Sequence, residues 1–116
     1  MELWIFATPN GWKVTIMLEE LKFPSPLLPD DESRWDVIQW VIWQAANLGP
    51  TFGNKLSYTR YMDDIPAEQK VHPLQRFTLE AQRLLRILDK QLAGRDYLCG
   101  DNFTIADIAC YPWVRG

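Results

Sequence analysis

The fold is decided by residues 97–109, which read YLCGDNFTIADIA. Within them, Thr104 is placed so that its hydroxyl can accept a hydrogen bond from the backbone N–H of Asp107, while the Asp107 carboxylate accepts from the N–H of Thr104. Phe103, just before this capping box, can pack on Ile108 as a hydrophobic staple. Losing such a cap costs about 0.5–2 kcal/mol. The stretch predicts a helix start and gives Asp107 a structural role rather than that of a catalytic acid.

Size and composition limit the class of protein. The chain has 116 residues, 47% of them hydrophobic and 23% charged, as expected for one globular domain. Its net charge of −3 provides no basic surface for nucleic acid or for an anionic membrane. No apolar run approaches the roughly 18 residues of a membrane span, and the N-terminus lacks signal-peptide features. We therefore expect a cytoplasmic protein with neither nucleic-acid nor membrane partners.

Two cysteines and one histidine offer little for metal or nucleophilic chemistry. Cys99 and Cys110 are not in a metal-ligand spacing, and in the cytosol we expect both to be reduced structural thiols. His72 precedes a proline, and we expect it at the surface. The sequence predicts no metal site.

The N-terminal segment is typical of a βα unit. Residues 3–7 are expected to form a short apolar strand, and Asn10, at the end of a Thr-Pro-Asn turn, is the expected N-cap of a helix over 11–22. The expected buried face of that helix consists of Val14, Met17, Leu18 and Leu21. Because a lone strand exposes two unpaired edges, we expect a loosely held N-terminus or a homodimer.

Helices account for the rest of the chain. Prolines in 24–29 break regular structure, and acidic residues from Asp30 favour a helix start. Its expected buried stripe is Trp35, Ile38, Val41 and Ile42, widened by Trp40 and Trp43, and a kink or end is expected at residues 48–50. After a stretch of weak signal, in which Pro66 could start a turn, a helix is expected over 74–92. Its buried residues would be Phe77, Ala81, Leu84, Leu85 and Leu88, with Ala93-Gly94 closing it and a last helix over 104–114.

Both ends of the chain resemble one family. The string from YLCGD at 97–101 to ACYPW at 109–113 resembles the buried capping motif in the C-terminal helical domain of glutathione transferases. Residues 3–15, LWIFATPNGWKVT, resemble the first strand and helix of the thioredoxin-like half of these enzymes. The Thr-Pro-Asn-Gly turn is similar to that of the Ure2-like and bacterial nu-class branch.

The resemblance implies a mostly α fold: a glutathione transferase C-terminal-like helical bundle preceded by a βα remnant of a thioredoxin-like domain. The expected boundaries are 1–23 for the remnant, 24–29 for a Pro-rich joint and 30–116 for an incomplete helical domain. Most of the thioredoxin-like domain, and the family's last helices, have no counterpart here.

The resemblance also implies glutathione as co-substrate, transferred to an electrophilic small molecule or used to reduce a disulfide. In the similar branch, the threonine and asparagine at the positions of Thr8 and Asn10 contact the glutathione sulfur. A helix N-terminus and hydrogen-bond donors lower the pKa of a thiol, which favours the reactive thiolate. Arg76 lies at the position of an interface arginine that could hold a glutathione carboxylate.

Simpler interpretations remain open for each of these residues. Asn10 could be only a helix cap, and Arg76 could simply face water. Four aromatic residues could line an apolar pocket for an electrophile or belong to the core: Tyr58, Tyr61, Trp40 and Trp43. The chain could also be a non-catalytic module that binds apolar ligands or a regulatory partner, or an inactive remnant.

Overall fold

The computed structural model describes residues 7–22 and 27–115, and all regular elements in these ranges are helical. In chain order they are α1 (Pro9–Glu20), α2 (Arg34–Trp43), the π-helix η1 (Gln44–Leu48), α3 (Gly49–Arg60), α4 (Ala67–Leu92) and α5 (Ile105–Arg115). The predicted mostly α bundle is confirmed. The strand predicted over 3–7 falls almost entirely outside the described residues.

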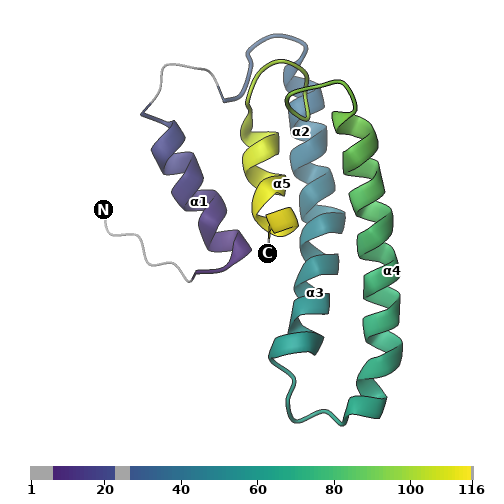
Figure 1. Ribbon diagram of the computed structural model, residues 1–116. Coiled ribbons are helices and arrows are strands. Elements are labelled where there is room, and N and C mark those ends of the chain that lie inside the picture. The colour runs from purple at the N-terminus through teal and green to yellow at the C-terminus, as the bar shows by residue number, and fades with distance from the viewer. Residues whose placement is uncertain (1–6, 23–26, 116) are drawn as a thin grey trace.

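The segments α2, η1 and α3 form one continuous rod (Figure 1). Instead of the end or kink predicted at residues 48–50, the rod contains a π-turn, in which the N–H of Gly49 bonds to the carbonyl of Gln44 five residues earlier. Pro50 has no N–H that could donate to a carbonyl in the preceding turn. The wider π-turn before it lets the helix continue without that hydrogen bond. The helix direction is thus preserved past a proline.

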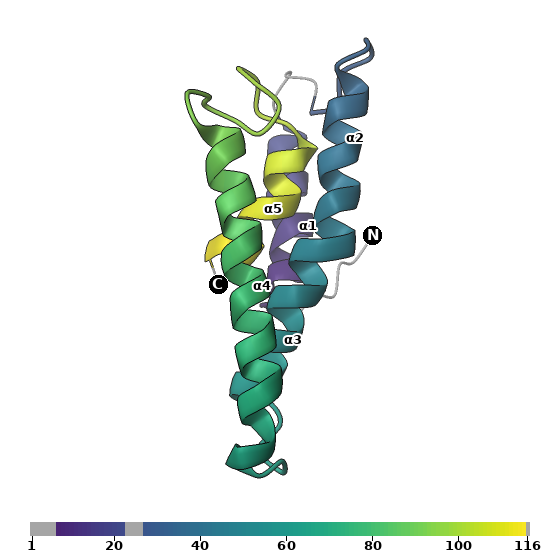
Figure 2. The ribbon, with the colours of Figure 1, turned by 90° about the vertical axis from the view of Figure 1, so that its right-hand side faces the viewer.

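Helix α4 runs antiparallel to this rod and packs along α3 (Figures 1 and 2). The prediction that it starts at Leu74 was wrong, because the helix begins at Ala67 after Pro66 and continues through Pro73. Packing against α3 compensates for the one backbone bond that Pro73 removes. Its C-terminus matches the prediction, since Gly94 has a φ of +73°, a conformation that glycine adopts at little cost.

The core surrounds α5, which lies between α1 and the α2–α4 layer (Figure 1). Its buried cluster joins α5 to the rod, to α4 and to the turn before α5, and consists of Val37, Leu48, Leu84, Leu88, Leu98, Ala106, Cys110 and Trp113. The carbonyl of Leu27 accepts from the N–H of Ile105 at 3.0 Å, which attaches the segment before α2 to the start of α5. Trp40 and Trp43 pack against this core, edge to face with each other at 5.1 Å.

The buried stripe predicted for α2 was correct in part: Val41, Trp40 and Trp43 pack against the core. In α2, Trp35 is 68% exposed and Ile42 is 60% exposed, whereas Val37 is buried. The face toward the core follows Val37, Val41, Gln44 and Leu48, and α2 is apolar on so many sides that periodicity alone does not select that face. The stripe predicted for α4 was correct at its centre, with Ala81, Leu84 and Leu88 buried, while Leu85 is exposed.

In α1, most of the predicted buried face points outward, and of its four residues Met17 alone is half-buried. Val14, Leu18 and Leu21 are exposed, and Ile16 is the side chain that faces a pocket shared with α5. Because α1 packs chiefly on α5 alone, only a narrow side of it is covered. No helix in the described ranges has both the length and the apolar character needed to cross a bilayer.

Candidate functional site

The first turn of α1 is built differently from the prediction. Thr8, not Asn10, is the N-cap: its backbone is extended, and its Oγ1 accepts from the N–H of Gly11 at 3.3 Å. Pro9 occupies the first helical position, where its fixed φ suits a helix start and its missing N–H costs nothing. Asn10 therefore lies inside the first turn, and its side chain is exposed. The predicted capping role of Asn10 was wrong, which leaves its amide unused by the cap.

Two hollows flank this first turn. The first, which we call the polar hollow, has a volume of about 480 Å³ and is lined by Asn10 and Lys13 of α1 and by residues of η1, α3 and α5. The second, the cationic hollow, has a volume of about 290 Å³ and contains Thr8, Lys55 and Arg60 around an aromatic floor. Trp113 of α5 contributes to both walls. The start of α1 thus separates two concave surfaces.

Lys13 attaches α1 to the rest of the bundle inside the polar hollow. Its Nζ donates to Oε1 of Gln44 at 2.9 Å and lies 5.4 Å from the ring centre of Trp113. Gln44 is 4% exposed, so this is a link between a charged group and a buried amide. Partial burial lowers the pKa of Lys13 from its usual value. The ammonium is thus less well solvated than one at an open surface.

Two glycines of α3 make room for Trp113. A Cβ at Gly49 would lie 2.8 Å from Nε2 of Gln44 and 3.5 Å from Cε2 of Trp113, and one at Gly53 would lie 3.7 Å from Trp113 Cη2. The small residues let the indole lie against the α3 backbone. The ring is 7% exposed, and its Nε1–H has no hydrogen-bond partner among the described residues.

Arg76 lies elsewhere. It is exposed on α4 and lines a third hollow together with His72, Arg83 and Arg86, and none of the described residues that line this hollow belongs to α1. The structure therefore brings Thr8 and Asn10 together at one helix start and leaves Arg76 apart from them. His72 is exposed, as expected.

The start of α5 confirms one half of the predicted capping box and corrects the other. Oδ2 of Asp107 accepts from the N–H of Thr104 at 2.9 Å and from its hydroxyl at 3.1 Å. The Thr104 hydroxyl accepts from the N–H of Ala106 at 3.3 Å, not from that of Asp107 as predicted. The Asp107 N–H instead bonds to the Thr104 carbonyl at 3.1 Å, because the first turn is tightly wound.

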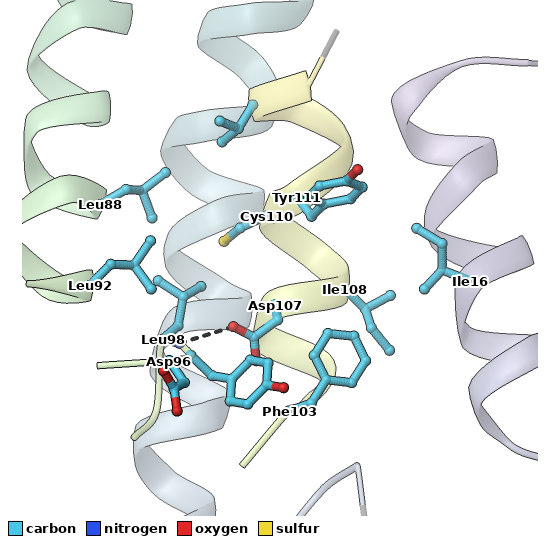
Figure 3. Close-up of a pocket in the computed structure, with 12 residues that line it drawn as sticks. Ile16, Leu88, Leu92, Asp96, Leu98, Phe103, Asp107, Ile108, Cys110 and Tyr111 are labelled. Atoms are coloured by element: carbon cyan, nitrogen blue, oxygen red, sulfur yellow. Dashed lines mark hydrogen bonds between the residues drawn. The ribbon is translucent and has the colours of Figure 1, made fainter. Parts of the chain in front are cut away.

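Asp107 also holds the loop before α5. Its Oδ1 accepts from the N–H of Leu98 at 2.9 Å, the bond that is dashed in Figure 3. The Leu98 carbonyl accepts from Nε2 of Gln91 at 2.7 Å, which connects the loop to α4. Phe103 packs edge to face on Tyr97, with ring centres 5.6 Å apart, while its staple contact with Ile108 stays a prediction. Every hydrogen bond of this carboxylate is structural.

An apolar pocket that the sequence did not indicate lies beside this loop (Figure 3). It has a volume of about 480 Å³ and opens between Ile16 of α1, Leu92 of α4 and Ile108, Tyr111 and Val114 of α5. We name it the apolar pocket. Its walls come from both ends of the chain, so no local pattern in the sequence could predict it.

Both cysteines are free, as predicted. Cys110 lines the apolar pocket, and burial raises the pKa of its thiol to about 12. Burial also raises the pKa of Cys99. A thiol with a raised pKa is a poor nucleophile at neutral pH. No group of three or more histidine, cysteine or acidic residues in the described ranges is arranged to hold a metal ion.

The aromatic residues left open by the sequence take different places. Tyr58 of α3 stacks on Phe77 of α4, with ring centres 6.0 Å apart, and so joins these two helices. Tyr61 lines the cationic hollow and is exposed. Only Tyr61 therefore lies beside the start of α1.

Comparison with known proteins places these features in a family. Residues 73–116 match the family model for the glutathione S-transferase C-terminal domain. A glutathione S-transferase domain-containing protein of Dictyostelium discoideum is 47% identical over 105 residues, which cover 87% of this chain and 39% of that protein. The disulfide-bond oxidoreductase YfcG of Escherichia coli is 36% identical over 87 residues, covering 74% of this chain and 38% of the relative. The chain thus spans about two fifths of the length of these curated relatives.

A second Escherichia coli disulfide-bond oxidoreductase, YghU, is 41% identical over 179 aligned positions that include 97% of this chain and 59% of the relative. Since this chain has 116 residues, the alignment contains positions where it has no counterpart.

Among solved structures, a glutathione transferase family member from Pseudomonas fluorescens with two bound glutathiones superimposes with a TM-score of 0.83. The identity is 29%, and the match covers 93% of this chain and 72% of that one. The Ure2-like branch indicated by the Thr-Pro-Asn-Gly turn fits these neighbours. On the sequence matches, the helical fold and the capping box, this chain belongs to the glutathione S-transferase family.

Proposed function

We propose that this chain uses glutathione at the start of α1, either transferring it to an electrophilic small molecule or using it to reduce a disulfide. The observation that carries the proposal is the first turn of α1, where Thr8 forms the cap and the amide of Asn10 stays exposed at the edge of the polar hollow. Two relatives are named disulfide-bond oxidoreductases, and the Pseudomonas fluorescens structure contains glutathione.

The donors at this helix start suit a thiolate. The Thr8 hydroxyl accepts from Gly11, which leaves its own O–H free to donate, and the Asn10 amide has two N–H groups. The N-terminal end of the helix carries a partial positive charge, and Lys13 one turn later adds a full one. The hydrogen-bond donors, the helix N-terminus and the Lys13 charge all lower the pKa of a nearby thiol and raise the fraction of the reactive thiolate at neutral pH.

Chemically, the glutathione thiolate then attacks an electrophilic carbon and forms a C–S bond while the leaving group departs with its electron pair. With a disulfide, the thiolate attacks one sulfur, and the other sulfur leaves as a thiolate that takes up a proton. A second glutathione thiolate resolves the mixed disulfide to glutathione disulfide, and the substrate leaves as a second thiol. Thr8 and Asn10 hold the attacking sulfur in both reactions.

The role of Arg76 as the partner of a glutathione carboxylate stays a separate proposal. Its support is the hollow in which Arg76, Arg83 and Arg86 lie together with one carboxylate, that of Glu80, which pairs with Arg83 at 2.7 Å. If the role is correct, Arg76→Ala weakens glutathione binding about tenfold, whereas Arg86→Ala leaves it unchanged. Equal binding in both variants would remove Arg76 from the site.

The test of the activity uses two substrates, a chromogenic aryl halide and a small symmetrical disulfide, each with glutathione. Asn10→Ala should lower the active rate about tenfold or more at neutral pH, because it removes a donor that stabilises the glutathione thiolate and so lowers the thiolate fraction. Asn102→Ala is the matched control, since Asn102 is also exposed and lies in the loop before α5. Equal rates in the two variants, or no turnover of either substrate, would remove the enzyme proposal and leave an inactive remnant or a binding module.

A second candidate function is the binding of an apolar small ligand, which the apolar pocket favours. Its volume of about 480 Å³ is within the range of small-molecule sites. Titration with the neutral dye Nile red should give saturable fluorescence, reduced by Ile16→Trp, which fills the pocket, but not by Leu18→Trp on the exposed face of α1. A flat titration would count against this function.

The homodimer expected from the sequence also stays a proposal. Sedimentation equilibrium measures it directly, and a monomer mass at micromolar concentrations would exclude it.

A further inference from the structure

The polar hollow has an unbalanced charge. Among the described residues that line it, Lys13 is charged and none is acidic. The remaining polar lining is formed by amides such as those of Asn10 and Gln44 and by the Ser57 hydroxyl, which itself donates to the Gly53 carbonyl at 2.9 Å. A concave site with one cation, several donors and no carboxylate attracts anions.

The Lys13 ammonium has N–H groups available for a ligand. An ammonium carries three N–H bonds, and Lys13 uses one of them on Gln44 at 2.9 Å. The ion pairs within the described ranges join Lys22 to Glu19 and Arg83 to Glu80, and Lys13 takes part in neither. Partial burial lowers the pKa of Lys13, so a nearby anion would stabilise its charged form.

Trp113 provides an independent observation. Its indole N–H is buried and has no acceptor among the described residues, and the residue as a whole is 7% exposed. The ring atom bonded to this nitrogen, Cε2, lies 3.5 Å from the Cβ position of Gly49, which lines the same hollow. A buried donor without an acceptor costs about 1–3 kcal/mol, and an acceptor from a ligand would remove that cost.

We propose that the polar hollow binds the carboxylate of a small anionic ligand, with one oxygen for the Lys13 ammonium and one for the Trp113 indole N–H. The ammonium lies 5.4 Å from the centre of the indole ring and both residues line the same hollow, so we expect one carboxylate to reach both donors. Because Asn10 lines the same hollow, the ligand is the acceptor substrate or glutathione itself; this assignment rests on the proposed function, whereas the carboxylate site does not.

The test follows the indole N–H directly by ¹H–¹⁵N NMR. The chain has six tryptophans, and the Trp113→Phe spectrum identifies the Trp113 signal as the one that disappears. The probe is 4-nitrobenzoate, and 4-nitrobenzamide is its neutral counterpart. We expect a saturable downfield shift of the Trp113 indole proton with the benzoate and an affinity at least fivefold lower for the amide.

Variants then test whether binding depends on the positive charge of Lys13 rather than on a general change of the fold. Lys13→Met should weaken benzoate binding about tenfold, and Lys13→Arg, which keeps the charge, should restore most of it. Lys55→Met is the matched control, because Lys55 lines the neighbouring cationic hollow, and it should bind as the unchanged chain does. No shift of the Trp113 signal with benzoate, or equal affinities for Lys13→Met and Lys13→Arg, would overturn the proposal.

Competition with S-methylglutathione distinguishes the two sources of the carboxylate. Displacement of benzoate assigns the site to glutathione, and simultaneous binding assigns it to the acceptor substrate. If glutathione fails to bind while benzoate still shifts Trp113, the carboxylate site stands and the proposed glutathione function fails.

Discussion

The starts of α1 and α5 are both capped by a threonine, but they serve different purposes. At α5, Thr104 is 2% exposed, and the Asp107 carboxylate accepts two bonds from it and one from Leu98. At α1, Thr8 is exposed, and a single bond of 3.3 Å to Gly11 forms the cap. A saturated, half-buried network holds the fold, whereas an exposed cap leaves donors available for a ligand.

Stability and ligand binding thus depend on different helix starts in this chain. Helix α5 is enclosed by α1, the rod and α4, so its polar groups need partners within the protein. Helix α1 is covered on one side only and is attached by α5 and by the Lys13–Gln44 bond. We therefore expect changes at α5 to alter the free energy of unfolding and changes at α1 to alter mainly binding.

The largest expected effect is that of Asp107→Ala. It leaves the N–H groups of Thr104 and Leu98 without their acceptor, so the free energy of unfolding should fall by about 3–5 kcal/mol. Urea denaturation followed by circular dichroism measures it. Asp101→Ala, at an exposed position in the same loop, should change the value by less than about 0.5 kcal/mol. Similar losses in both variants would contradict the central role of the capping box.

The next largest expected effect is a pH dependence of the free energy of unfolding that is caused by Cys110. The thiol pKa is about 12 in the folded chain and about 8.5 in the unfolded chain. The stabilisation from the protonated thiol is fully present below pH 8.5 and is lost as pH rises toward 12, because only the unfolded chain releases the proton. Above pH 8.5 the loss is about 1.4 kcal/mol per pH unit, or about 2 kcal/mol at pH 10.

Urea denaturation at pH 7 and pH 10 checks this, with Cys110→Ala as the reference. The variant should lose less stability between the two pH values by about the same 2 kcal/mol. Equal losses in the two proteins would show that Cys110 ionises normally, and so that the inner face of α5 is open to water.

The same substitution at the two caps sharpens the comparison. Thr104→Ala should cost about 1–2 kcal/mol, since it removes a buried cap, and Thr8→Ala about 0.5 kcal/mol, since its cap is exposed. The glutathione affinity should respond in the opposite order. If Thr8→Ala destabilises the chain as much as Thr104→Ala, the two starts are not separated in function.

The smallest effect on overall stability is expected for Lys13→Met. It breaks the bond to Gln44, which is worth about 0.5–1.5 kcal/mol locally, and should speed hydrogen exchange of α1 amides roughly 2–10-fold while α5 amides stay unchanged. Lys22→Met, at the exposed end of the same helix region, is the control. Faster exchange in α5 would mean that α1 and α5 open together.

Several elements could be predicted from the sequence because their signals are local. The start of α5 follows from the spacing of Thr104 and Asp107, and the end of α4 from Gly94. The centre of α4 follows from Leu84 and Leu88, which recur at helical spacing in a segment with many charged residues and so define one face. By contrast, α2 is apolar on several sides, and its true face depends on the rod and α5 around it.

The candidate site could be predicted only in part, for a similar reason. Asn10 and Thr8 belong to one turn, so a local sequence pattern sufficed to predict them as candidates. The predicted cap was Asn10, whereas Pro9 occupies the first helical position and Thr8 is the cap. Lys13, Gln44 and Trp113 lie far apart along the chain and meet only because α5 packs against both α1 and η1. The apolar pocket was missed because it too is formed by helices distant in sequence.

The most direct test of the central claim is calorimetric titration of glutathione into the whole chain, Asn10→Ala and Asn102→Ala. We predict measurable binding to the unchanged chain, the same affinity for Asn102→Ala and an affinity about tenfold lower for Asn10→Ala, as expected for one hydrogen bond to a charged sulfur. No heat of binding, or equal affinities for all three proteins, would contradict the assignment of the glutathione site to the start of α1.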